Sequence, residues 1–443
     1  MERSECSAQM LAQLGLDSVG ELFKDIPKGV RTKGLRLPDG MDELELTRVL
    51  DEMMSSNKPV TDWLSFLGAG MYHHFTPAAV KTIVSRSEFI TSYTPYQSEI
   101  SQGMLQALFE YQSFMVELTG MDYMNCSMYD ASTAVGEAVL MGHRIGGGSR
   151  FLMSRAVNPE RKEVARVYAK GADIEISEVA YDRNTGQVDL ADFESKMGDD
   201  VIGFYFETPN FLGPLETGWK DIRETLGEKV MVVGVNPLAL ALIKPPGDMG
   251  ADIVVGDAQV FGIPMSFGGP SIGVFGCRDE HIRKMPGRLI GMTEDAEGTR
   301  SYCMTLQTRE QHIRRSKATS NICTNEALLA VAVATHLALL GRSGLRRVAA
   351  KNIENMRSLS KRMDAIDGFS APVFDSPHFN EFTVRSSRPT GDVGADLLQR
   401  QIHGGVRLDR WFPELSDCTL YATTEMHTAA DHDRLISALE ECR

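Results

Sequence analysis

The stretch Val254–Gly276, VVGDAQVFGIPMSFGGPSIGVFG, decides how this chain folds. An apolar, β-branched run is followed by a turn, a glycine-rich loop and a second apolar run, which predicts two strands joined by a loop. A loop of this kind often presents the lysine that bonds an aldehyde cofactor. This loop contains no lysine, and Gln259 stands where the amine is expected.

Similar apolar runs precede this stretch and alternate with helical patterns. VIGFYFE and KVMVVGV are typical of buried strands, whereas NPERKEVARVYAKGA has a proline near its first turn and a glycine at its end, as helices do. This alternation predicts an α/β fold with a mostly parallel sheet covered on both faces. After the sheet we expect a long helical passage from roughly Thr308 to Arg362.

The two ends of the chain have patterns of their own. Residues 1–60 contain two amphipathic helical segments, which predict a helical N-terminal arm lying over its own body or over another subunit. Residues 61–325 form the predicted large α/β domain. Residues 326–443 read as a small C-terminal α+β domain.

Charge and cysteine usage narrow the function classes. The 443 residues include 46 basic and 60 acidic side chains, and a net charge of −14 disfavours binding to nucleic acid or to an anionic membrane. The seven cysteines include no C-x-x-C pair, which argues against a zinc site or a disulfide framework and favours a reducing cytosol. We therefore expect a cytoplasmic protein without a membrane span or a bound metal.

Four separated strings carry a specific resemblance to a known family. They are FLGAGMYHHFTPAAVKTI (66–83), FITSYTPYQSEISQGMLQALFEYQ (89–112), PGRLIGMTEDAEGTRSYCMTLQTREQHIRRSKATSNICTNEAL (286–328) and TLYATTEMHT (419–428). Over nearly the whole chain they make it similar to the first subunits of two-subunit glycine decarboxylases, the P-proteins of the glycine cleavage system. The resemblance implies the fold-type I, aminotransferase-like architecture of pyridoxal-phosphate enzymes.

The resemblance also implies an activity and a set of partners. P-proteins condense glycine with pyridoxal phosphate, release CO2 and pass the aminomethyl group to the lipoyl arm of the H-protein, while the T-protein and the L-protein act in the same system. The chemistry needs a lysine for the cofactor, a carboxylate beside the pyridine nitrogen, and backbone amides at a helix start for the phosphate.

Two of these groups are missing from the chain. Matching QVFGIPMSFGGP to the pattern of the second subunit places Gln259 at the lysine and puts Val233, in VMVVGVN, at the carboxylate. An amide cannot form a Schiff base. At the expected phosphate site, Ser132 and Thr133 stand where the second subunit has a Ser-Gly-Ala run, and we interpret them as a relic that caps a helix rather than as a phosphate cradle.

The resemblance therefore implies a subunit that works only with a partner. Pyridoxal phosphate is expected on subunit 2, and none is expected to be bonded to this chain. Fold-type I sites lie between two subunits, so this chain can complete its partner's site within a heterodimer, and two heterodimers within an α2β2 tetramer. Tyr93, Thr94, Tyr96 and Gln97 in SYTPYQ are the best candidates to reach that site; the alternative is that these tyrosines only pack at the interface.

Other residues carry weaker signals. We expect His73 and His74 to form hydrogen bonds in an interface loop rather than to bind a metal, and Asn210 and Gly213 to shape a loop after a strand. One basic passage reads as ordinary helix surface, with docking of subunit 2 or of the H-protein as the alternative; it comprises Arg300, Arg309, Arg314, Arg315 and Lys317.

Two other functions stay open from the sequence. One is a non-catalytic scaffold or regulatory pseudoenzyme that contributes no atoms to catalysis. The other is an independent pyridoxal-phosphate enzyme that uses another lysine, such as Lys220 or Lys244.

Overall fold

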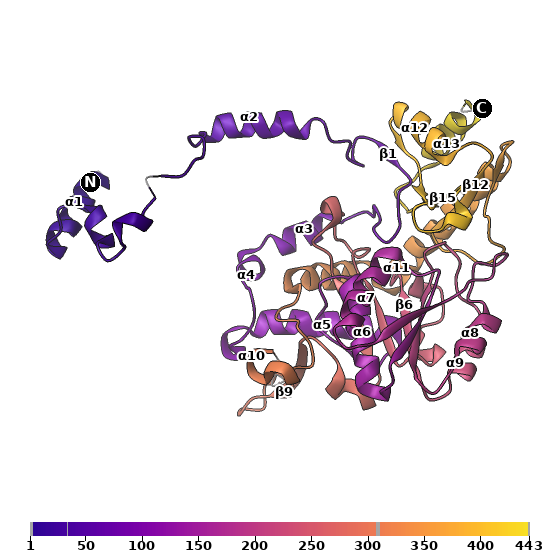
Figure 1. Ribbon diagram of the computed structural model, residues 1–443, viewed down its shortest axis with the longest axis horizontal. Coiled ribbons are helices and arrows are strands. Elements are labelled where there is room, and N and C mark those ends of the chain that lie inside the picture. The colour runs from indigo at the N-terminus through magenta and orange to yellow at the C-terminus, as the bar shows by residue number, and fades with distance from the viewer. Residues whose placement is uncertain (1–2, 33, 307–310, 442–443) are drawn as a thin grey trace. The chain divides into compact units, whose positions relative to one another are not determined.

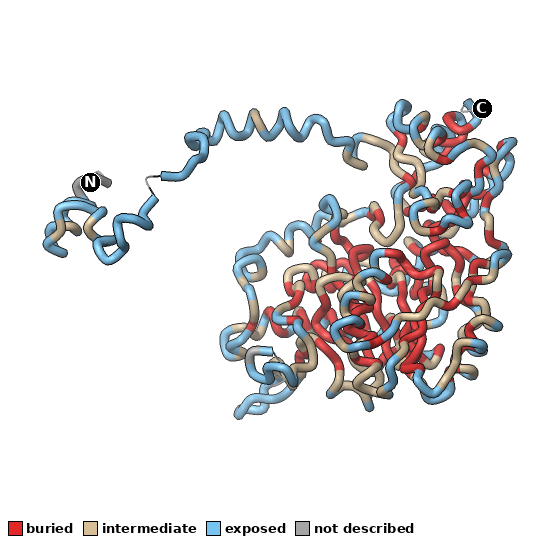
Figure 2. The backbone as a smooth tube through the Cα atoms, viewed as in Figure 1, coloured by how far each residue is buried: buried red, intermediate tan, exposed pale blue. Residues whose placement is uncertain are grey.

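The computed structural model describes residues 3–32, 34–306 and 311–441, and the chain separates into two units, Met1–Pro59 and Val60–Arg443. The first unit contains the two predicted helices, α1 (Arg3–Leu14) and α2 (Glu43–Met54). Its described apolar side chains are exposed or half-exposed, and the tube of Figure 2 shows no buried residue along it. The described residues of this unit therefore form no buried core of their own.

The second unit is built on a seven-stranded sheet in the order β2-β8-β7-β6-β5-β3-β4. In Figure 1 this sheet lies around the label of its central strand, β6. Neighbouring strands are parallel except at β8, which runs antiparallel to both β7 and β2. The mixed, mostly parallel sheet is therefore confirmed. Its strands are β2 (Tyr123–Met124), β3 (Arg150–Ser154), β4 (Glu175–Val179), β5 (Val201–Thr208), β6 (Val230–Val235), β7 (Ile253–Asp257) and β8 (Gly273–Cys277).

Side chains of the central strands alternate between two buried layers, because successive residues of a strand point to opposite faces. In β6, Met231 and Val233 pack in a core with α5 and α11, whereas Val230 and Val232 pack in a second core with α6 and α7. The covering helices are α5 (Gln102–Thr119), α6 (Ala131–Gly146), α7 (Pro159–Lys170), α8 (Leu190–Lys196), α9 (Trp219–Leu226) and α11 (Ala327–Asp364). The sheet is thus covered on both faces, as expected.

Capping residues in the sequence mark where the helices begin and end. Helix α7 begins with the Asn158 side chain accepting from the backbone of Glu160 and with Pro159 in its first turn, and α5 ends at Gly120, whose φ is 65°. Glycine takes this left-handed conformation without a Cβ penalty, which makes it a common helix stop.

The prediction of one helical passage from Thr308 was wrong. Thr308 lies outside the described residues, and the segment after it forms only a short helix, α10 (Gln311–Arg314), and a 3-10 turn before α11 starts at Ala327. The intervening ATSNICTN (318–325) is rich in Ser, Thr and Asn, whose side chains bond to nearby backbone and compete with a helix.

The C-terminal part contains a separate antiparallel sheet of order β11-β12-β15-β14, namely β11 (Phe369–Ser370), β12 (Glu381–Ser386), β14 (Val406–Arg407) and β15 (Cys418–Ala422). Helices α12 (Thr390–Gln399) and α13 (Ala429–Glu441) share a core with it. Strand β1 (Leu64–Ser65) pairs in parallel with β13 (Ile402–His403), which ties the chain after the first unit to this part. The border at residues 325/326 stays a prediction.

Among the described residues, α11 is the one helix long and apolar enough to meet the length and composition of a membrane span. Half of its apolar window is buried inside the protein, as in a core helix, and Gly341 interrupts the helix with a φ of 57°.

Candidate functional site

The carboxyl ends of β5, β6 and β7 surround a small polar cavity. In open sheets of this kind, ligands bind outside the carboxyl ends of the strands. The cavity has a volume of about 30 Å³, which leaves room for about two water molecules. Its polar lining includes Tyr72, Asn158, Arg161, Glu207, Asn210, Asn236, Asp257 and Glu381.

Gln259 is a buried structural residue at the edge of this cavity. Its side-chain oxygen accepts from the backbone N–H of Tyr72 (3.0 Å), and its side-chain nitrogen donates to the carbonyls of Tyr72 (2.9 Å) and Ile263 (2.7 Å). The residue is 1% exposed. The amide thus joins two distant segments and has no free group to offer a ligand.

Val233 lies in the middle of β6 and is fully buried. It packs in the apolar core beneath α5 and α11, with neighbours such as Met231 and Val254. A carboxylate at this position would be buried among apolar side chains, which costs several kcal/mol unless it is paired. The position predicted for the pyridine carboxylate is therefore ordinary core.

The start of α6 is occupied by the chain's own acids. Asp130 caps the helix through the backbone N–H of Thr133 (2.7 Å), and the Thr133 hydroxyl completes a capping box. Asp257 accepts from the N–H of Ala131 (3.3 Å) and from the hydroxyl of Ser271 (2.5 Å). The interpretation of Thr133 as a capping residue is confirmed. Ser132 lies half-buried on the same turn.

These three observations test whether pyridoxal phosphate fits this chain. The lysine position holds a fully bonded amide, the carboxylate position is apolar, and two carboxylates lie where a phosphate would need donors. The carboxylates of Asp130 and Asp257 would repel the negative charge of a phosphate bound beside them. The residues present do not fit the cofactor.

A buried network of charged and polar side chains lines the cavity. Arg161 donates to Glu207 (2.9 Å), which also accepts from the Tyr205 hydroxyl (2.8 Å). The side chains of Arg161 and Glu207 are 13% and 3% exposed. Burial disfavours the Arg161 cation, but the adjacent Glu207 carboxylate outweighs it, and the pKa of Arg161 is raised.

Glu381 extends the network from β12. It accepts from the Tyr72 hydroxyl (2.7 Å) and from the backbone N–H of Ala69 (2.6 Å), and it is 3% exposed. Burial raises the pKa of Glu381 to about 7, although the two hydrogen bonds and Arg161 favour the carboxylate. This acid therefore changes its charge near neutral pH.

Substitution of Glu381→Gln is expected to alter how stability depends on pH. An exposed glutamate has a pKa of about 4.3, so between that pH and about 7 the folded chain keeps a proton that the unfolded chain releases, and stability falls as pH rises. The free energy of unfolding of the variant, relative to that of the unsubstituted protein, should therefore be about 2–3 kcal/mol higher at pH 8 than at pH 5. Urea unfolding at both pH values measures this, with exposed Glu110→Gln as control; a parallel pH dependence in both proteins would contradict it.

The predicted partner-facing residues lie in one exposed loop between α4 (Ser87–Ile90) and a 3-10 turn at Ser98–Ile100. Tyr93 and Tyr96 are 70% and 61% exposed, whereas Pro95 between them is buried. Thr94 is half-buried and Gln97 is exposed. The run before the loop, SEFI (87–90), forms a single helical turn after Arg86.

The weaker candidates divide between structural and surface roles. The ring of His74 is buried and bonded to Glu425 (2.8 Å), and the carbonyl of His73 accepts from Thr424, so both are used inside the chain. Asn210 bonds to the carbonyl of Gly186 and to the N–H of Leu212, while Gly213 comes so close to Glu381 that a Cβ would lie 2.6 Å from its carbonyl. Their predicted role in shaping the loop is confirmed.

The described part of the basic passage is exposed, and the prediction of a helix surface holds only for its second half. Arg300 begins strand β10 (Arg300–Thr305), which pairs with β9 (Leu289–Glu294), and Arg314, Arg315 and Lys317 are exposed around the short α10. Arg309 lies outside the described residues.

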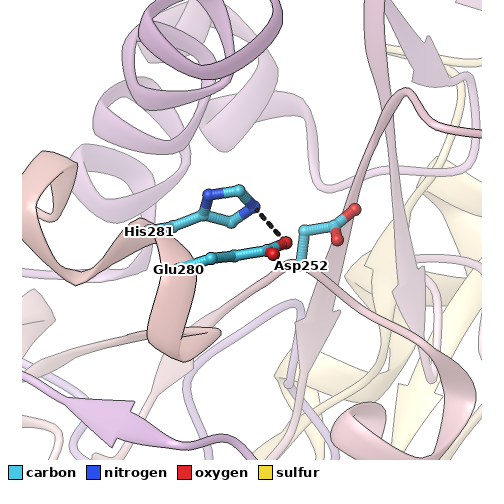
Figure 3. Close-up of side chains that lie close together, drawn as sticks. All are labelled: Asp252, Glu280 and His281. Carbon is cyan, nitrogen blue, oxygen red and sulfur yellow. Dashed lines mark ion pairs between the residues drawn. The ribbon is translucent and has the colours of Figure 1, made fainter.

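One group of possible metal ligands occurs among the described residues: Asp252, Glu280 and His281 (Figure 3). His281 faces its neighbour Glu280 (3.3 Å), but Asp252 already binds Arg223 (3.0 Å) and the backbone N–H of Met231 (2.7 Å). Because the guanidinium neutralises the central carboxylate, we assign no metal to this group.

Four residues of functional interest were missed from the sequence: Arg161, Glu207, Glu381 and Arg288. The first three come from α7, β5 and β12, and no spacing in the sequence links them. Arg288 lies in the family string PGRLIG but in no pattern that indicates its contacts.

Known relatives resemble this chain from end to end. The family described as glycine cleavage system P-protein matches residues 2–439. "Probable glycine dehydrogenase (decarboxylating) subunit 1" from Pyrococcus abyssi is 49% identical over 439 residues, which cover 98% of this chain and 97% of that protein. The protein of the same name from Geobacillus kaustophilus is 47% identical over 438 residues, with the same coverage.

Solved structures agree with this relationship. A crystal structure of the glycine decarboxylase (P-protein) of the glycine cleavage system, in inhibitor-bound form, matches with a TM-score of 0.92 and 37% identity, covering 100% of this chain and 99% of the other. A glutamate decarboxylase from Lactobacillus brevis matches with a TM-score of 0.70 at 12% identity over 95% of this chain and 97% of its own, which shows a shared fold alone.

The fold is that of the pyridoxal-phosphate fold-type I enzymes, and the carboxyl edge of its sheet carries hydrogen-bonded amides and carboxylates where that cofactor would need a lysine and donors to its phosphate. The match over residues 2–439 and the identity to relatives across the full chain establish the family. This chain belongs to the P-proteins of the glycine cleavage system.

Proposed function

We propose that this chain is subunit 1 of a glycine dehydrogenase (decarboxylating), inactive alone, and that it completes the active site of a second subunit that carries pyridoxal phosphate. The names of its relatives support the subunit assignment. The observation that carries the proposal is the retained fold with a cofactor site that its own residues have closed.

The loop Tyr93–Gln97 is the part of this chain proposed to reach the partner. Two exposed tyrosines stand on either side of a buried proline in the sequence, and Ile90 and Ile100 near them are 58% and 80% exposed. Large apolar side chains gathered at one exposed segment are typical of a protein interface. In this role Tyr93, Thr94, Tyr96 and Gln97 bind and orient groups in the partner's site through their hydroxyls and amide.

The complete assembly would then consume glycine and the lipoyl disulfide of an H-protein, release CO2, and leave the aminomethyl group on one sulfur and a thiol on the other. The disulfide is the oxidant, so no other electron acceptor is needed. We place the assembly, a heterodimer that doubles to α2β2, in the cytoplasm, where the T-protein and the L-protein would act on its product.

Substitutions Tyr93→Phe and Tyr96→Phe, made separately in the complex purified with its partner, test this function. Each removes one hydroxyl and keeps the ring, and loss of one hydrogen bond in the site is expected to lower the rate of glycine decarboxylation about tenfold or more. Assembly should stay intact by size-exclusion chromatography. Tyr123→Phe, on edge strand β2, is the matched control and should keep full activity.

Unchanged glycine–CO2 exchange in both loop variants would favour a scaffold that contributes no atoms to catalysis. Pyridoxal phosphate bonded to Lys220 or Lys244 of this chain would instead support an independent enzyme. In the structure the amines of both lysines lie against the Trp219 ring, at 5.5 and 5.0 Å from its centre.

A further inference from the structure

Arg288 is fixed at the start of β9 by contacts of its own backbone. The carbonyl of Arg288 accepts from the N–H of Cys126 (2.8 Å), and the preceding Pro286 carbonyl accepts from the side chain of Asn125 (3.1 Å). Between them, Gly287 has a φ of 78° and passes so close to Asn125 that a Cβ would lie 2.6 Å from its side-chain nitrogen. A glycine is therefore required there, and the arginine after it has a defined direction.

The guanidinium of Arg288 connects two segments that are far apart in the sequence. One nitrogen, Nη1, donates to the Thr94 hydroxyl (3.1 Å) and to the side chain of Asn325 (3.2 Å). The other, Nη2, donates to the carbonyl of Cys323 (2.7 Å). The guanidinium carbon also lies 5.5 Å from the centre of the Tyr96 ring, within the range of a cation–π contact.

These contacts use features that only arginine has. Its planar fork donates in several fixed directions and stacks on an aromatic ring at the same time, whereas a lysine offers a single compact charge. Among the described residues, no carboxylate lies within 4.0 Å of this guanidinium. The guanidinium contacts neutral polar groups and the ring of Tyr96. Arg288 therefore fixes the positions of these groups and does not form an ion pair.

We propose that Arg288 is a positioning residue for the reaction in the partner's site: it fixes Thr94 and the ring of Tyr96 in the conformation in which the loop Tyr93–Gln97 reaches that site. This inference rests on the proposed function of the loop. Tyr93, Thr94, Tyr96 and Gln97 are exposed or half-exposed, so packing restrains them little. Arg288 supplies the missing restraint from the body of the large domain.

Two measurements on the complex purified with its partner test the proposal. Arg288→Met should lower kcat for glycine decarboxylation about 10- to 100-fold, with KM for glycine changed less than threefold, because a misplaced loop costs transition-state geometry more than binding. It should also speed hydrogen exchange of the Tyr96 amide, which donates to the Thr94 carbonyl (2.9 Å), at least tenfold. Arg385→Met, which breaks an exposed ion pair with Asp417, is the matched control and should alter neither.

A double-mutant cycle separates positioning from an independent effect. If Arg288 acts through the loop, Arg288→Met combined with Tyr96→Leu should lower kcat no further than the stronger single variant. Thr94→Val, which removes one acceptor with little change in volume, should reproduce part of the loss and keeps the test open if Arg288→Met fails to assemble.

The outcomes distinguish this proposal from the function on which it rests. If Tyr96→Leu lowers kcat but Arg288→Met leaves both kcat and loop exchange unchanged, or if the two losses multiply, the role of Arg288 is overturned and the proposed function stands. If Arg288→Met loosens the loop and neither variant lowers kcat, the loop takes no part in the reaction and both proposals fall.

Discussion

Replacing Gln259→Lys is expected to lower the free energy of unfolding by about 3–5 kcal/mol and to leave the chain without bound pyridoxal phosphate. The substitution removes three hydrogen bonds to Tyr72 and Ile263 and places an ammonium group at a position that is 1% exposed. The rest of the cofactor site stays absent, because Val233 is core and Asp257 occupies the helix start.

Urea unfolding and the visible absorbance of the protein mixed with pyridoxal phosphate measure the two effects. Gln106→Lys is the matched control, since Gln106 is exposed on α5 and bonds to Glu110 (2.9 Å), which can pair with an introduced amine. A visible aldimine band that disappears on borohydride reduction and leaves a pyridoxyl group on the amine introduced at position 259 would contradict the conclusion that this chain does not bind the cofactor.

Arg161→Met is expected to destabilise the chain by a similar amount, about 3–5 kcal/mol, because it leaves the carboxylate of Glu207 buried without its cation. The loss of stability comes from the unpaired, buried carboxylate of Glu207 and not from the energy of the ion pair itself. The double variant Arg161→Met/Glu207→Gln should therefore recover part of the stability, since the second change removes that charge.

Chemical denaturation of the single and double variants checks this prediction. Arg86→Met breaks an ion pair with Glu88 in which both side chains are more than half exposed, and it should change the unfolding midpoint little. The account would be wrong if Arg161→Met and Arg86→Met lowered stability equally, or if the double variant were less stable than Arg161→Met.

The fold could be predicted from the sequence because its signals are local. The β7–loop–β8 unit follows from two apolar runs around a glycine-rich loop, and α7 from a proline at its start and a glycine at its end. Helix α11 was predicted to start too early, because the run of polar residues before Ala327 was read together with the apolar residues after it.

The candidate site could be predicted only in part. Gln259 and Val233 were found because a family pattern states what should stand at those positions. The buried network at the carboxyl edge of the sheet could not be found this way, since Arg161, Glu207 and Glu381 meet only after α7, β5 and β12 have folded together. Residues that are this far apart in the sequence and meet only in the folded chain form no recognisable sequence pattern.

The central claim is that this chain has lost its own cofactor site and completes that of a partner. Its most direct test is to purify the chain together with subunit 2, reduce the complex with borohydride, and map the pyridoxyl group by peptide mass spectrometry. We predict one pyridoxyl group per heterodimer, bonded to a lysine of subunit 2. A pyridoxyl group on any lysine of this chain would contradict the account.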